Sequence, residues 1–333
     1  MNPFVYTTVE KVDEATSLLS KNLNAKIIAG GTNLIDLMKE NISKPDEIID
    51  VNRIPGLDQI KELENGCIRL GALARNADTA YHPIIAKRYP LLSRAILAGA
   101  SAQLRNMASN GGNLLQRTRC YYFYDTATPC NKRVPGSGCS AIGGYNRIHA
   151  ILGASEDCIA VFPSDMCVAL AALDATINIS GSAGERSVAF ADFHRLPGDT
   201  PHLDNNLQQD EMITSIDLPV NGFENNYAYL KLRDRTSYAF ALVSVASAFE
   251  IEGSIIKEAR LALGGLAHKP WRNKDAEDIL TNKEASVENF SAAADLILKD
   301  AKAYDRNAFK IELARRAIVR NCLNAANLHS NPI

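Results

Sequence analysis

The sequence lacks an excess of charge of either sign. Its 36 Lys and Arg residues nearly balance 38 Asp and Glu residues, which leaves a net charge of -2. Because nucleic-acid binding needs a strongly basic face, this balance predicts no nucleic-acid partner. Apolar runs long enough to cross a bilayer are also missing, so the sequence predicts no insertion into a membrane.

The N-terminal segment, MNPFVYTTVE, lacks a basic region followed by an apolar stretch. The sequence therefore predicts no signal peptide in this chain. Hydrophobic residues make up 46% and charged residues 22% of the 333 residues, which is typical of a globular protein with two or three domains. Seven cysteines are too few for a disulfide scaffold at this length. Their positions in the chain must therefore indicate whether they bind a metal or lie in the core.

Residues 1–60 alternate helical and strand patterns. Apolar residues recur at helical spacing in VEKVDEATSLLSKN, and a second short helix is predicted at NLIDLMKEN. The segments AKIIA and EIIDV have the pattern of buried strands. A strand, a crossover helix and a second strand form a βαβ unit, so a parallel pair of strands is predicted in this α/β lobe.

Two further segments are predicted, residues 61–205 and residues 210–325. The first begins with strand character in IRLGAL, continues through the helical stretch PLLSRAILAGAS and ends in apolar strands within 160–181. In the second, four strands that begin with EMITSIDLP are predicted to form an antiparallel meander. Helices are expected to follow them near 274–281, 286–304 and 308–323.

Two glycine turns of similar composition lie far apart in the chain. In AKIIAGGTNLIDLMK, Gly30 and Gly31 allow positive φ and close approach to a ligand, and the following helix N-terminus favours an anion. The turn matches neither familiar nucleotide loop, and a plain structural turn is the alternative interpretation. The segment SNGGNLLQ, residues 109–116, has the same composition: a small hydroxyl residue, two glycines and an asparagine. Two such turns predict a clamp on the two phosphates of one pyrophosphate, unlike the single loop of a Rossmann fold.

A long loop at residues 116–160 is rich in glycine, proline and tyrosine. Loops of this length in compact domains are usually functional or disordered. Soft thiolates suit an iron–sulfur cluster or zinc, although the spacing C-x9-C-x8-C-x18-C matches neither a zinc ribbon nor a ferredoxin. The loop cysteines are Cys120, Cys130, Cys139 and Cys158, whereas core positions are expected for Cys67, Cys167 and Cys322.

The pair AGGTNL and SNGGNL resembles the A-G-G-x-S/T and T-I-G-G-N turns of the FAD-binding subunits of molybdenum hydroxylases. FPSDMCVALAALDA, YLKLRDRTSYAFALVSVA and ALGGLAHKPWR resemble further signatures of that family, so the resemblance extends over nearly the whole chain. NLLQRTRC, PCNKRVPGSGC and HAILG are similar to its aldehyde oxidoreductase branch. Asn110 stands where the family usually has an apolar residue, and Asn33 stands where a hydroxyl residue is common.

The resemblance implies an α+β fold. It consists of a two-lobed FAD-binding domain of the vanillyl-alcohol oxidase and molybdenum hydroxylase type, plus a C-terminal α+β domain of antiparallel sheet and helices. The loop 116–160 is then an insertion in the second lobe. The implied FAD-binding residues are Ile27, Ile28, Ala29, Gly30, Gly31, Thr32, Asn33, Leu34, Ala100, Ser109, Gly112, Asn113, Leu115, Asp165, Ile213 and Lys231.

Three of these positions have specific implied roles. Asp165 would hold a polar part of the cofactor, with a helix N-cap as the alternative. Ile213 would pack on the isoalloxazine ring, with an interior strand residue as the alternative. Lys231 would lie near the ring and favour the reduced, anionic flavin, with a solvated strand face as the alternative.

The resemblance also implies a [4Fe–4S] cluster bound by Cys120, Cys130, Cys139 and Cys158. A structural zinc ion is the alternative metal. His149 is a second candidate ligand, but a surface histidine or a hydrogen-bond donor is the preferred interpretation of that residue.

The implied function is electron transfer, with no catalytic residue in this chain. Electrons would come from a [2Fe–2S] small subunit beside a molybdenum-cofactor large subunit, which together with this chain form a heterotrimer, and would pass through FAD to an external acceptor. The alternatives are an FAD subunit of a xanthine or purine dehydrogenase and a self-contained flavin oxidoreductase. The expected compartment is the periplasm, by co-export with a signal-bearing partner, or the cytoplasm.

Overall fold

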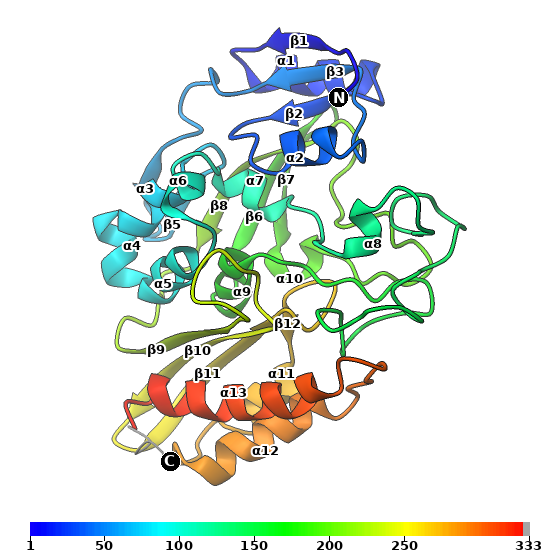
Figure 1. Cartoon of the computed structure of the whole chain (residues 1–333). Coiled ribbons are helices and arrows are strands. Elements are labelled where there is room, and N and C mark those ends of the chain that lie inside the picture. The colour runs from blue at the N-terminus through cyan, green and yellow to red at the C-terminus, as the bar shows by residue number, and fades with distance from the viewer. Residues whose placement is uncertain (329–333) are drawn as a thin grey trace.

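The computed structural model describes residues 1–328, which form three β-sheets with helices packed on them (Figure 1). The N-terminal sheet has the order β1-β3-β2, and all of its pairings are parallel. The predicted parallel pair and its helices are confirmed. The elements of this lobe are β1 (Val5–Thr8), α1 (Val12–Lys21), β2 (Lys26–Ile28), α2 (Leu34–Lys39) and β3 (Glu47–Asp50).

The second sheet is antiparallel and has the order β4-β5-β8-β6-β7. Its strands are β4 (Ile60–Glu62), β5 (Ile68–Gly71), β6 (Thr176–Gly181), β7 (Gly184–Ala189) and β8 (Met212–Leu218). Strand β8 was expected in the C-terminal meander, but it pairs with β5 and β6 instead. The expectation was wrong because residue alternation reveals a strand but not the partner with which it pairs.

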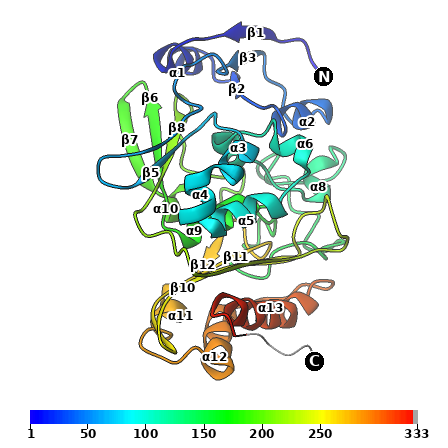
Figure 2. The same cartoon turned by 90° about the vertical axis from the view of Figure 1, so that its left-hand side faces the viewer.

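Short helices connect β5 to the insertion loop. They are α3 (Asn76–Tyr81), α4 (Pro83–Arg88), α5 (Pro90–Ala98), α6 (Ala102–Arg105) and α7 (Asn110–Leu114). The loop that follows contains α8 (Tyr121–Tyr124), and α10 (Phe190–Phe193) comes after β7. Figure 2 shows α3, α4 and α5 on one side of the second lobe.

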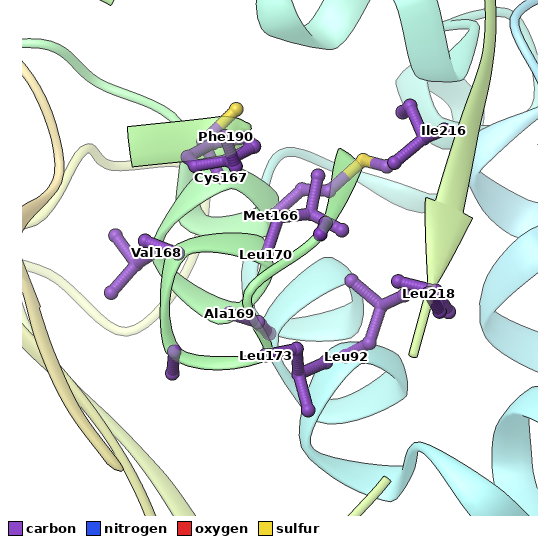
Figure 3. Close-up of a cluster of buried hydrophobic side chains, with 14 of the residues drawn as sticks. Leu92, Met166, Cys167, Val168, Ala169, Leu170, Leu173, Phe190, Ile216 and Leu218 are labelled. Carbon is purple, nitrogen blue, oxygen red and sulfur yellow. The ribbon is translucent and has the colours of Figure 1, made fainter. Parts of the chain in front are cut away.

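Helix α9 (Asp165–Ala172) lies at the centre of the molecule, and all eight of its residues are buried. Apolar strands were expected within 160–181, but only the later part of that stretch forms a strand. The earlier part is helical because the Ser164 hydroxyl accepts a hydrogen bond from the Cys167 N–H at 3.1 Å and caps an alanine-rich run. Figure 3 shows Leu92, Ile216 and Leu218 among the side chains around this helix.

The C-terminal sheet has the order β12-β11-β10-β9, and helices cover one of its faces (Figures 1 and 2). The strands are β9 (Asn226–Leu232), β10 (Val243–Glu252), β11 (Ile255–Gly264) and β12 (Trp271–Arg272). The three predicted helices are confirmed as α11 (Lys274–Asp278), α12 (Val287–Leu298) and α13 (Phe309–Ala325). Within residues 1–328, no helix is both long and apolar enough to cross a membrane.

Candidate functional site

The two glycine turns meet in the structure, although Gly30 and Ala108 lie 78 positions apart in the sequence. A Cβ atom placed on Gly30 would lie 1.8 Å from the carbonyl oxygen of Met107, so only glycine permits this contact. Gly31 follows with a φ of +70°, which a glycine adopts without strain. The first turn therefore sits directly against the segment that leads into the second.

Two polar side chains that sequence analysis missed fasten the turns together. The Asn52 side-chain amide donates to the Ala29 carbonyl at 3.1 Å. The Arg75 guanidinium donates to the Met107 carbonyl at 2.6 Å and to Asn52 Oδ1 at 3.5 Å. Neither residue lies within a glycine motif, so no local sequence signal marks them.

The second turn rests on a buried network of amides and hydroxyls. Ser109 caps α7 by accepting from the Gly112 N–H at 3.3 Å. The Asn113 side chain donates to Asn76 Oδ1 at 2.7 Å and accepts from the Ser164 hydroxyl at 2.5 Å. Its amide is thus occupied by protein groups and fixes the turn against α9.

Asn110, at a position where the resemblance implied an apolar residue, has buried polar partners in the structure. This residue is fully buried, and its amide donates to the Thr79 hydroxyl at 2.9 Å. Its carbonyl oxygen accepts from the Asn76 amide and from the Thr79 hydroxyl, each at 3.1 Å. The exchange of an apolar side chain for an amide is thereby compensated by two other buried polar residues.

Asn33 offers an unused hydrogen-bond donor at the start of α2. Its Oδ1 accepts from the Arg117 N–H at 3.0 Å, while its Nδ2 is buried and has no partner among the described residues. A buried amide donor is costly unless a ligand oxygen satisfies it. The arrangement therefore fits a hydrogen-bond acceptor such as a phosphate oxygen.

The other FAD-binding residues that the resemblance implied in and beside the first turn are half-buried: Ile27, Ile28, Thr32 and Leu34. Leu115, which follows α7 in the second turn, is exposed. Ile213 is buried in β8 within the core of the second lobe. Its packing against the isoalloxazine ring stays a prediction.

Lys231 and Asp165 form a buried ion pair. The Lys231 ammonium lies 2.7 Å from Asp165 Oδ2 and donates to the Ala98 carbonyl at 3.1 Å. The Tyr229 hydroxyl donates to Asp165 Oδ1 at 2.7 Å, and burial raises the pKa of Tyr229 well above its ordinary value. The alternative of a solvated strand face for Lys231 was therefore wrong. The N-cap alternative for Asp165 was also wrong, because Ser164 caps α9.

An open hollow of about 490 Å³ lies beyond the end of α5. Ala100 lines it with a φ of +50°, immediately after Gly99, at which an added Cβ would lie 3.2 Å from Asp165 Oδ2. The hollow thus adjoins the ion pair. Its remaining lining residues are Ser101, Gln103, Leu104, Ser237 and Tyr238, so its lining includes neither a carboxylate nor a histidine.

The four loop cysteines line one small pocket, whose cavity volume is only about 10 Å³. Burial raises the pKa of the Cys120 thiol to about 12 and that of the Cys158 thiol to about 11. Within residues 1–328, no three Cys, His, Asp or Glu side chains converge as the ligands of one metal ion would. Cys167 and Cys322 are buried as expected, whereas Cys67 is only half-buried, so the expectation of a core position was wrong for that residue.

His149 also belongs to this pocket region. Its Nε2 lies 3.1 Å from Cys120 Sγ, and burial lowers the pKa of the imidazole to about 4. Only 1% of the residue is exposed, so the expectation of a surface histidine was wrong. A hydrogen bond with Cys120 explains the position of this ring.

Two family models cover nearly all of the chain. The model of the FAD binding domain in molybdopterin dehydrogenase matches residues 2–221. The model of the CO dehydrogenase flavoprotein C-terminal domain matches residues 227–325. The chain belongs to the FAD-binding subunits of the molybdopterin dehydrogenases. It is therefore a flavoprotein subunit of a molybdenum-containing oxidoreductase, and the predicted FAD cofactor is confirmed.

Curated relatives and solved structures of this family agree with the assignment. The chain is 48% identical over 319 residues to the aldehyde oxidoreductase FAD-binding subunit of Escherichia coli strain K12, with 96% of each chain covered. It is 31% identical to the glyceraldehyde dehydrogenase medium chain of Sulfolobus acidocaldarius, over 84% of this chain and 82% of that one.

A solved carbon monoxide dehydrogenase from Hydrogenophaga pseudoflava superposes with a TM-score of 0.76 at 27% identity, covering 98% and 97% of the two chains. Quinoline 2-oxidoreductase from Pseudomonas putida 86 superposes with a TM-score of 0.75 at 23% identity, covering 98% and 99% of the two chains. This second likeness supports the fold alone. The predicted two-lobed FAD domain with a C-terminal α+β domain is confirmed.

Proposed function

We propose that this chain is the electron-transferring FAD subunit of a molybdenum-dependent aldehyde oxidoreductase. Its partners are a molybdenum-cofactor large subunit and a [2Fe–2S] small subunit, and electrons leave FAD for an external acceptor. The observation that carries this proposal is the 48% identity to an aldehyde oxidoreductase FAD-binding subunit over 96% of both chains. The hollow beside Lys231 supports a transfer role, because no lining side chain is a carboxylate or histidine that would serve as an acid or base.

The assigned residues have distinct tasks toward FAD, which supplies the redox chemistry when bound. The turn from Ala29 to Asn33 binds one side of the pyrophosphate, and Ser109, Gly112 and Asn113 form the other side. Gly30 supports this proposal because its contact with Met107 brings the turns together. Lys231 would supply a positive charge beside the flavin ring, and Asp165 holds its ammonium in place.

Cys120, Cys130, Cys139 and Cys158 are proposed to hold a [4Fe–4S] cluster. All four thiols line the same pocket, and thiolates are the ligands that such clusters require. A single zinc ion would need its sulfur ligands gathered at about 2.3 Å from one point, whereas a cluster spreads its ligands around a larger body. The four thiols line this pocket without three of them converging as the ligands of one ion would, which favours the cluster over zinc.

The partners and the substrate are tested together. The chain is co-expressed with its neighbouring genes, the complex is purified through a tag on this chain, and mass spectrometry identifies the bound subunits. The proposal expects two partners and turnover of aldehydes but not of purines. Turnover of a purine alone would favour the xanthine dehydrogenase alternative, and aldehyde turnover by the isolated chain would favour the self-contained oxidoreductase. A twin-arginine signal on a partner would place the complex in the periplasm, and its absence would leave it in the cytoplasm.

A further inference from the structure

Helix α2 belongs to both cofactor regions. Its N-terminus carries the first glycine turn, with Asn33 as the N-cap residue. One side of α2 packs on the cysteine loop. The buried Leu37 side chain lies there in one apolar cluster with Cys120, Cys130 and Cys158. One short helix therefore contacts the pyrophosphate turn at one end and the cysteine pocket along its side.

Polar contacts strengthen the same connection. The Arg119 guanidinium donates to Asp36 Oδ2 at 2.6 Å and to the Tyr124 hydroxyl at 2.8 Å. The Tyr124 hydroxyl in turn donates to Asp36 at 3.0 Å, so the three side chains form a closed triad. Arg119 directly precedes Cys120, and Tyr124 ends the helix that Cys120 begins as its N-cap residue. Cys120 is thus connected to Asp36 on α2 through its chain neighbours Arg119 and Tyr124.

We propose that Asp36, Arg119 and Tyr124 are positioning residues that couple occupancy of the cysteine pocket to FAD binding. The proposal rests on the cluster assigned above. The loop has little regular structure of its own, so a bound cluster supplies much of the order that fixes Arg119 and Tyr124. These residues then hold α2 so that the amide of Asn33, which has no partner among residues 1–328, faces the phosphates. Because linkage is reciprocal, bound FAD strengthens retention of the cluster by the same factor.

The test measures the dissociation constant of FAD for the full chain in its purified complex, by flavin fluorescence, before and after removal of iron. The wild type is expected to bind FAD about tenfold more weakly without iron, which is a typical size for such coupling. Asp36→Asn is expected to bring that ratio close to one without changing the iron content of the loaded chain. Asp36→Glu should restore part of the ratio, and Tyr124→Phe should reduce it.

Asp13→Asn is the matched control, because Asp13 is exposed in α1 and distant in sequence from both turns. This control should keep the wild-type ratio. An unchanged FAD affinity on iron removal, or a tenfold ratio that persists in Asp36→Asn, would overturn the coupling while leaving the cluster intact. A wild-type chain that takes up no iron would refute both the cluster and the coupling. The FAD stoichiometry of that chain would show separately whether the flavin is still bound.

Discussion

Lys231 on β9 and Asp165 on α9 meet as an ion pair of 2.7 Å, with only 4% and 7% of their side chains exposed. The pair joins the C-terminal domain to the second lobe at the hollow beside Ala100. Removal of one partner leaves the other charge buried without compensation, which typically costs about 3 kcal/mol or more. The buried pair therefore has a structural and an electrostatic consequence, and the two are separable by experiment.

The first prediction concerns Lys231→Met. FAD should remain bound because both glycine turns are intact, but loss of the cation should lower the midpoint potential of the flavin. The global stability should fall by roughly 3 kcal/mol, and addition of Asp165→Asn should recover part of that loss. Spectroelectrochemical titration and urea unfolding measure the two effects. Lys257, whose side chain is 43% exposed, provides the control Lys257→Met. An unchanged flavin potential in Lys231→Met would show that Lys231 does not lie in the flavin environment.

The second prediction concerns the loop cysteines. Iron and acid-labile sulfide should each approach about four per chain. Serine at any of the four loop cysteines should lower both, whereas Cys322→Ser should leave them unchanged because Cys322 is buried beneath the C-terminal sheet. One zinc per chain without sulfide would replace the cluster by a structural zinc ion. Iron retained after Cys158→Ser would instead make His149 the fourth ligand.

The third prediction follows from the Asn110 network. Asn110→Leu should leave the Asn76 amide and the Thr79 hydroxyl without their buried partner, at a cost of roughly 1–3 kcal/mol in unfolding free energy. The double variant Asn110→Leu, Thr79→Val should lose less than the sum of its two single changes. Urea denaturation of all three variants gives the coupling. Additive losses would show that the network does not act as a unit.

The fourth prediction is a pH dependence from His194. Burial lowers the pKa of this ring to about 4, and its Nε2 donates to the Leu114 carbonyl at 2.9 Å. In the unfolded chain this histidine binds a proton near pH 6.5, whereas the folded ring stays neutral down to about pH 4. The contribution of His194 to the free energy of unfolding is therefore complete above pH 6.5 and declines as the pH falls to 4. The decline is up to about 3 kcal/mol. His194→Gln should flatten the stability curve in that window, and an unaltered slope would contradict the assignment.

Local sequence patterns predicted the helices, the strands and the two glycine turns. They did not predict which strands pair or which side chains meet across the fold. Glycines at positions 30, 31 and 112 mark backbone that approaches another group, which a sequence displays directly. In contrast, Asn52 and Arg75 act only because the fold brings Ala29 next to Met107. The placement of β8 failed for the same reason, since strand pairing depends on partners that are distant in the chain.

The central claim is that one FAD is held between the two glycine turns, and its most direct test is the FAD content of Gly30→Ala. The added methyl group would collide with the Met107 carbonyl and separate the turns. Gly143→Ala is the control, because a Cβ there meets nothing within 4 Å. We expect the Gly30 variant to fold, as judged by circular dichroism, and to purify with little FAD, whereas the control keeps one per chain. One FAD per chain in a folded Gly30→Ala protein would contradict the two-turn site.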